Sequence, residues 1–122
     1  MAHTSHVLIV TTKPELFANW PADMVHVVED MASAKLRLQE FTYRLVFSDK
    51  GKLGPKSADN GFRLAQFVAS THPQTATYVI ADQVQSFDRQ WAETQGAAGL
   101  IRRDPGVILS TKRTISIRRP GG

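Results

Sequence analysis

Tyr43-Arg44-Leu45-Val46-Phe47-Ser48-Asp49 is the stretch that decides the fold, together with His6-Val7-Leu8-Ile9-Val10-Thr11-Thr12. Each is a short run of apolar and β-branched residues, a pattern typical of a buried strand. The earlier strand ends in two hydroxyls and the later one ends in a lone carboxylate. If the two strands are neighbours in one parallel sheet, Thr11, Thr12 and Asp49 share a pocket at the carboxyl ends of the strands.

Strand and helix patterns alternate over the remainder of the chain. We expect further strands at Val25–Val28, Tyr78–Ala81 and Ala98–Ile101. Apolar residues at helical spacing predict helices over Met31–Glu40, Phe62–Val68 and Val84–Gln95. Ser57 or Asp59 is the expected cap of the second helix. This alternation predicts an α/β fold, with a parallel five-stranded sheet and helices on both faces.

The bulk composition limits the class of protein. A chain of 122 residues has room for one domain with a hydrophobic core. It has no cysteines, which excludes disulfides, zinc–thiolate sites and thiol nucleophiles. No apolar run is long enough to span a membrane, and the first residues lack the pattern of a signal peptide. We therefore expect a cytoplasmic protein that does not enter a membrane.

The positive charge gathers at the C-terminal end. The formal net charge is +4, and residues 102–122 carry six basic residues against Asp104 alone. The rest of the chain is close to neutral. We therefore divide the chain into a domain over residues 1–105 and a basic C-terminal extension over residues 106–122. Such an extension either meets an anionic partner or only keeps the protein in solution.

Three motifs, in this order, resemble one known family. They are the strand that ends in Asp49, the segment Asp59-Asn60-Gly61 at the start of a helix, and the segment Gly96-Ala97-Ala98-Gly99-Leu100-Ile101-Arg102-Arg103-Asp104-Pro105. Over roughly residues 6–105, the pattern is similar to the receiver domain of bacterial two-component response regulators. The resemblance implies the flavodoxin-like (CheY-like) fold for this part of the chain.

The resemblance also implies a phosphoryl-transfer switch, and this sequence departs from it. Asp49 matches the aspartate that accepts the phosphate. Thr11 and Thr12 stand where the family has an acidic pair that binds Mg²⁺. Ala81, with an alignment that allows a shift of one position, stands for the switch hydroxyl, and Arg103 replaces a Lys. Because Mg²⁺ needs carboxylate ligands, we expect poor metal affinity and no resident cofactor.

Two hypotheses follow for Asp49. It is either a working phosphosite or the acid that is left from one, paired with Arg103 or Lys50. The lost acidic pair favours the second, because charge that develops during phosphoryl transfer would not be compensated. The sequence also offers no nucleophile–base pair for a hydrolase or transferase. We therefore expect no enzymatic activity.

The ends of the receiver-like region depart from the family in shape. Residues 13–24 are interrupted by Pro14 and Pro21, so the first helix should be shortened to one or two turns. Residues 106–117 read as an extended, non-helical tail. One face of the sheet would then lack helical cover, and soluble proteins rarely expose such a face. The tail, a second copy in a homodimer, or a protein partner should cover it.

Three functions remain open at this stage. The preferred one is a degenerate receiver that binds a partner protein without phosphorylation, through the side formed by the helix near 84–95, the last strand and the tail. The second is an effector that binds cyclic di-GMP through arginines, as some CheY-like proteins do. Its candidate anion-binding or nucleotide-binding residues are Arg102, Arg103, Lys112, Arg113, Arg118 and Arg119. The third is phosphoacceptor signalling through Asp49.

Binding of nucleic acid is not expected. The domain is nearly neutral outside its last residues, whereas nucleic acid requires a broad basic surface. Trp20, Trp91 and the phenylalanines fit core or helix-packing positions better than platforms for stacked bases.

Overall fold

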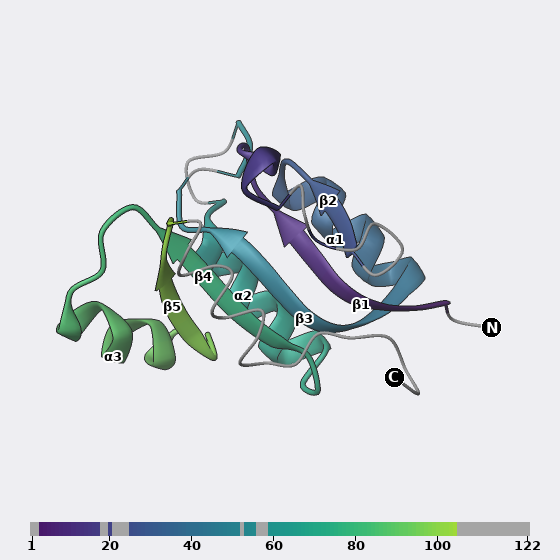
Figure 1. The fold of residues 1–122 in the computed structure, drawn as a ribbon. Coiled ribbons are helices and arrows are strands. Elements are labelled where there is room, and N and C mark those ends of the chain that lie inside the picture. The colour runs from purple at the N-terminus through teal and green to yellow at the C-terminus, as the bar shows by residue number, and fades with distance from the viewer. Residues whose placement is uncertain (1–2, 18–19, 21–24, 52, 56–58, 105–122) are drawn as a thin grey trace.

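A five-stranded sheet forms the centre of the protein (Figure 1). The computed structural model describes residues 3–17, 20, 25–51, 53–55 and 59–104. The strands are β1 (His3–Val10), β2 (Val25–Val28), β3 (Phe41–Asp49), β4 (Ala76–Ala81) and β5 (Gly99–Arg102). They lie in the order β2-β1-β3-β4-β5, and every pair is parallel. This is the flavodoxin-like order, so the predicted fold class is confirmed.

Three α-helices cover one face of the sheet: α1 (Met31–Glu40), α2 (Gly61–Thr71) and α3 (Ser86–Thr94). Buried residues of α1 and α2 pack on Leu8, Val10 and Val46. Ala65 of α2 and Ala92 of α3 pack on Val79, Ala81 and Leu100. Since side chains alternate across a strand, these sheet residues share one face.

The opposite face carries Val7, Ile9, Leu45, Phe47 and Ile80. In the described part of the chain, its helical cover is the short 3₁₀ helix η1 (Pro14–Phe17), followed by Trp20. The Trp20 ring meets Phe47 edge to face, with 5.4 Å between the ring centroids. The predicted shortened first helix is therefore confirmed.

The predicted extended tail, including residues 106–117, and the boundary of the basic C-terminal extension lie outside the described residues. What else covers this second face of the sheet stays a prediction.

Local interactions explain where the helices begin and end. The Asp30 carboxylate accepts a hydrogen bond from the Ser33 N–H at the start of α1. Asn60 caps α2 by accepting from the N–H groups of Phe62 and Arg63, so the expected cap at Ser57 or Asp59 was wrong. Asn60 takes the cap position because it directly precedes the first turn of α2, where its side chain reaches the free N–H groups of that turn.

The tryptophans occupy contrasting positions. Trp20 is 6% exposed, as expected for a core residue, but Trp91 is 56% exposed and Phe87 is 64% exposed. Phe87 and Trp91 therefore do not lie in the core. The reason is the position of α3, which lies beyond the last strand and buries Ala92 toward the sheet (Figure 1). Among the described helices, none is both long and apolar enough to cross a membrane.

Candidate functional site

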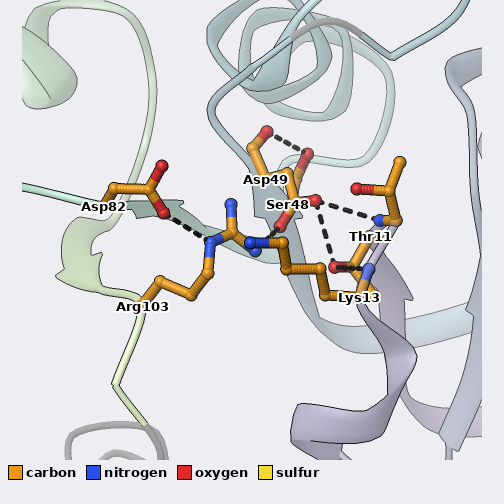
Figure 2. A network of polar contacts seen from close by, with 7 residues as sticks. Thr11, Lys13, Ser48, Asp49, Asp82 and Arg103 are labelled. Carbon is orange, nitrogen blue, oxygen red and sulfur yellow. Dashed lines mark hydrogen bonds and ion pairs between the residues drawn. The ribbon is translucent and has the colours of Figure 1, made fainter.

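Asp49 lies at the carboxyl end of β3 and is 5% exposed. Its Oδ2 accepts two hydrogen bonds, each of 3.0 Å, from the Thr11 hydroxyl and from the Thr12 backbone N–H. These donors follow β1, which lies next to β3. The predicted meeting of Thr11, Thr12 and Asp49 is therefore what the structure has, and Figure 2 shows the contacts.

The two threonines contribute differently. Thr11 is fully buried, and its hydroxyl donates to Asp49 while it accepts from the Lys13 backbone N–H. Thr12 has an exposed side chain and reaches Asp49 through its backbone alone. The turn after β1 is thus built around the carboxylate, with a hydroxyl and a backbone group in the place of further acids.

Arg103 supplies the positive charge opposite Asp49. Its Nη1 donates to Oδ1 of Asp49 at 2.7 Å, and its Nε donates to Oδ1 of Asp82 at 2.8 Å. The Arg103 backbone N–H donates to the Ala81 carbonyl, which continues the β4–β5 pairing past the end of β5. One guanidinium group therefore joins the end of β3 to the residue that follows β4 (Figure 2).

The titration behaviour follows from these contacts. The hydrogen bond and positive charge of Arg103 hold the pKa of Asp82 below its usual value. Burial acts to lower the pKa of Arg103, but the hydrogen bonds and charges of Asp82 and Asp49 outweigh it, so the pKa is raised. Both partners of the exposed ion pair stay charged at neutral pH.

Lys50, the other expected partner, does not pair with Asp49 in the described structure. Its side chain is exposed, while its backbone N–H donates to the Ile80 carbonyl at 2.8 Å. Of the two partners that the sequence allowed, the carboxylate takes Arg103.

The switch position carries no hydroxyl. Asp49 is in register with Ile80, and Ile80 belongs to the apolar cluster on the η1 face of the sheet. Ala81 points to the other face, where it packs with Ala65 of α2. The sequence alignment allowed the switch position to be Ala81 or, with a shift of one residue, Ile80. Both of these side chains are apolar. Neither can donate a hydrogen bond toward Asp49.

The residues around Asp49 do not fit a resident Mg²⁺ ion. Mg²⁺ requires hard, anionic oxygen ligands. Within the described residues, no three His, Cys, Asp or Glu side chains come together as a metal site. Both oxygens of Asp49 already accept hydrogen bonds, and a guanidinium group neutralises its charge. Arg103 supplies the positive charge beside Asp49 that a metal ion would otherwise provide.

Helix α2 begins against the same strand end. A Cβ at Gly61 would lie 2.3 Å from the backbone oxygen of Asp49, and the Gly61 N–H donates to the Lys50 carbonyl. Gly61 therefore permits an approach that no other residue allows without a shift. The Ser48 hydroxyl also donates to the Asp49 carbonyl, so the backbone of the acid is held as well.

The comparisons with known proteins agree with this architecture. No family model and no curated protein sequence matches the chain. Solved structures do match. A two-component response regulator of the LuxR family from Aurantimonas sp. SI85-9A1 is similar with a TM-score of 0.71 at 19% identity, over 92% of this chain and 84% of the other.

Two further structures cover both chains almost fully. The receiver domain of NtrX from Brucella abortus has a TM-score of 0.69 at 19% identity, over 92% of this chain and 99% of that domain. The CheY-like receiver domain protein from Methanospirillum hungatei JF-1 has a TM-score of 0.69 at 13% identity, over 94% of each chain. This chain has the receiver-domain fold.

Within this receiver fold, the arginines that the sequence suggested as anion-binding residues lie in different surroundings. Arg103 turns into the site, whereas the Arg102 side chain is 57% exposed and pairs with Asp104 at 3.5 Å. Lys112, Arg113, Arg118 and Arg119 lie outside the described residues. Asp82 is the site residue that was not assigned a role from the sequence. Its position directly after β4 was the only signal for it.

Proposed function

We propose that the protein is a non-catalytic signalling adaptor, a degenerate receiver that binds its partner without being phosphorylated. The observation that carries the proposal is the state of Asp49. Its carboxylate accepts from Thr11 and Thr12 and forms an ion pair with Arg103, whose side chain is 14% exposed. Phosphorylation of a receiver changes the charge at this aspartate. In this chain, Arg103 already neutralises the charge of Asp49.

The side that includes α3 is the proposed docking surface. Phe87 and Trp91 lie one turn apart on this helix, and both are more than half exposed. Aromatic side chains of this kind are enriched at protein interfaces and supply much of the binding energy there. α3 stands beyond β5 at the edge of the sheet, where a partner can reach it (Figure 1).

The two alternatives have less support. Phosphoacceptor signalling through Asp49 would require a metal and a free carboxylate oxygen, while both oxygens of Asp49 accept hydrogen bonds. Binding of cyclic di-GMP would have to proceed through Arg102 and the residues beyond 104, because Arg103 already holds Asp49 and Asp82. A phosphorylation assay tests signalling through Asp49 directly. Calorimetry with cyclic di-GMP, on wild type and on an Arg113/Arg118/Arg119 triple alanine variant, tests binding of the dinucleotide.

Crosslinking in cells followed by capture tests the proposal. Four forms are compared: wild type, Asp49→Asn, a Phe87→Ser/Trp91→Ser double variant, and Leu36→Ser. Leu36 is a matched control, because it is 61% exposed on a different helix.

We expect the same crosslinked partner with wild type, Asp49→Asn and Leu36→Ser, and its loss with the double variant. Loss of that partner with Asp49→Asn in a folded protein would contradict phosphorylation-independent binding. Retention by the double variant would contradict the docking surface.

A further inference from the structure

The outer edge of β2 is open to pairing with a further strand. β2 stands at one end of the order β2-β1-β3-β4-β5, and no described strand lies on its other side (Figure 1). Soluble proteins usually protect such an edge with charges, proline or a bulge, because its backbone groups can pair with another chain. Apart from being short, the strand Val25–Val28 has none of these devices. The proposed docking surface on α3 lies at the opposite end of the sheet.

Val27 presents both backbone groups and apolar surface at this edge. The Val28 carbonyl accepts from the Thr11 N–H, so the backbone groups of Val28 face β1. Because successive residues of a strand turn their backbone groups to opposite sides, those of Val27 face outward. The Val27 side chain is 42% exposed and lies on the η1 face of the sheet, in register with Ile9. A strand added at this edge would bury it.

An acidic residue lies at each end of β2. Glu29 directly follows the strand and is exposed. Glu40 is also exposed, and it precedes Phe41, whose ring centroid lies 4.6 Å from that of His26. In the described part of the chain, neither carboxylate forms an ion pair. Both are therefore available to a basic segment that lies along β2.

The chain's own C-terminal extension contains a segment that matches this edge. Thr114-Ile115-Ser116-Ile117, which lies outside the described residues, alternates polar and β-branched apolar residues and is as long as β2. The basic pair Lys112-Arg113 precedes it, and the basic pair Arg118-Arg119 follows it. The adaptor function proposed above gives these basic residues no role. Their placement at both ends of four strand-forming residues complements the acid at each end of β2.

The length of chain after Asp104 permits this pairing and sets its direction. The described chain leaves β5 at the carboxyl edge of the sheet, four strand spacings or about 19 Å from β2. Residues 105–113 span up to about 30 Å when extended. They reach the carboxyl end of β2 first, so residues 114–117 run antiparallel to it. Parallel sheets of this class often carry one antiparallel edge strand.

We propose that residues 114–117 pair with β2 of the same molecule as an antiparallel sixth strand. Ile115 lies opposite Val27, exchanges backbone hydrogen bonds with it and covers its side chain on the η1 face. Ile117 lies opposite Val25 on that face, where Val25 already packs on the apolar cluster.

The same register brings the charges together. Arg113 lies opposite Glu29, and Arg118 leaves the strand at the end where Glu40 stands. Opposite charges placed in this way stabilise a pair of strands. The basic extension thus finds its anionic partner on its own molecule, and the β2 edge is closed to other chains.

Disulfide trapping in the full-length chain tests the pairing, because the protein has no cysteine of its own. In Val27→Cys/Ile115→Cys the two residues form an opposed pair with Cα atoms about 5.5 Å apart, a separation that suits a disulfide. Val27→Cys/Ser116→Cys is the matched control, because Ser116 points to the other face of the sheet. With oxidised glutathione, we expect an intramolecular disulfide in the first variant at least about tenfold faster than in the control. Alkylation of the remaining thiols and intact mass measure it.

The disulfide also identifies the molecule that supplies the strand. A disulfide-linked dimer as the main product would show that the segment of a second copy takes the edge, which would overturn the pairing within one molecule. Equal rates in the two variants would overturn the register.

Hydrogen exchange gives a second test in a chain without cysteines. The Val27 amide should be protected in wild type and should exchange at least about tenfold faster in Ile115→Pro, which removes one of the paired N–H groups. Thr111→Pro lies outside the pairing segment and should leave the Val27 amide protected. The Val28 amide faces β1 and should stay protected in every form. A Val27 amide that exchanges freely in wild type would overturn the proposal whatever the cysteine variants do.

Neutralisation of the acids tests the charge contacts. Glu29→Gln/Glu40→Gln should lower the protection of the Val27 amide about fivefold, as expected for two exposed ion pairs. Glu93→Gln, at an exposed position of α3, should leave it unchanged. Equal effects of the double variant and of Glu93→Gln would contradict contacts between the basic pairs and the ends of β2.

Discussion

Nη1 of Arg103 lies 2.7 Å from Oδ1 of Asp49, although 54 residues separate them in the chain. The pair joins the ends of β3 and β5, which are not neighbours in the sheet. Arg103 also reaches Asp82 after β4, the strand between them. The carboxyl edge of the sheet is thus closed by one guanidinium group.

Removal of this guanidinium group should destabilise the fold. Arg103→Ala leaves the Asp49 carboxylate buried without its cation, which typically costs about 3 kcal/mol in the free energy of unfolding. Urea denaturation checks this value. Arg102→Ala is the matched control, because its ion pair is exposed and should be worth less than about 1 kcal/mol.

A second substitution shows whether the charge is responsible. Arg103→Ala combined with Asp49→Asn should recover more than half of the lost stability, since no buried charge remains. Equal destabilisation by the single and double variants would mean that Arg103 stabilises through packing alone.

Gly61 should tolerate no side chain. A Cβ there would meet the Asp49 carbonyl oxygen at 2.3 Å, so Gly61→Ala has to push α2 away from β3. Overpacking of this kind costs about 1–3 kcal/mol, measured as a fall in the thermal midpoint. At Gly51 a Cβ would meet nothing within 4 Å, and Gly51→Ala should leave the midpoint nearly unchanged. Equal effects of the two substitutions would refute the close approach.

Alanine substitutions of the two tryptophans should affect the free energy of unfolding differently, because one lies in the core and the other on the surface. Trp20→Ala removes a ring packed against Phe17 and Phe47 and should cost about 3–5 kcal/mol of unfolding free energy. Trp91→Ala should change it by less than about 0.5 kcal/mol, because Trp91 is 56% exposed. Chemical denaturation followed by circular dichroism measures both. A large loss with Trp91→Ala would remove this residue from the docking surface.

Stability should fall in mildly acidic solution because of His26. Burial, aided by the charge of Arg37, lowers the pKa of His26 below its ordinary value of 6.5. The unfolded chain therefore binds the proton more readily than the folded protein. The stabilisation is fully present above pH 6.5 and is lost as the pH falls through the lower, folded pKa.

Thermal unfolding between about pH 7.5 and 5 measures this effect. His26 Nδ1 lies 2.6 Å from the Tyr43 hydroxyl, whose own pKa is raised by burial to about 12, so Tyr43 stays neutral throughout. His26→Gln should flatten the pH dependence. An unchanged slope in that variant would assign the loss to other groups.

The sequence predicted the site as far as strand ends can define it. Parallel strands bring their carboxyl ends to one edge, so Asp49 and Thr11 had to be close once their strands were recognised. The choice of Arg103 over Lys50 was not predictable, because it depends on which side chain turns inward. Arg102 and Arg103 are adjacent and look alike in sequence, yet Arg102 ends β5 with an exposed side chain, and Arg103, just past the strand, contacts Asp49.

The surface aromatic residues were missed for a related reason. Phe87 and Trp91 have the spacing of a buried helical stripe, and spacing does not reveal whether a sheet lies beneath it. α3 passes the edge of β5, so Ala92 makes the contact instead. The cap at Asn60 was missed because polar residues crowd the start of α2, and the backbone geometry selects among them.

The central claim is that Asp49 is a neutralised position and not a phosphate acceptor. Intact-mass measurement after incubation with a small phosphodonor and Mg²⁺ tests it most directly. We expect no added mass in wild type, because the carboxylate is bound by Thr11, Thr12 and Arg103. Within the described residues, moreover, no three His, Cys, Asp or Glu side chains come together beside it as a metal site. A gain of one phosphate that disappears in Asp49→Ala would contradict the account.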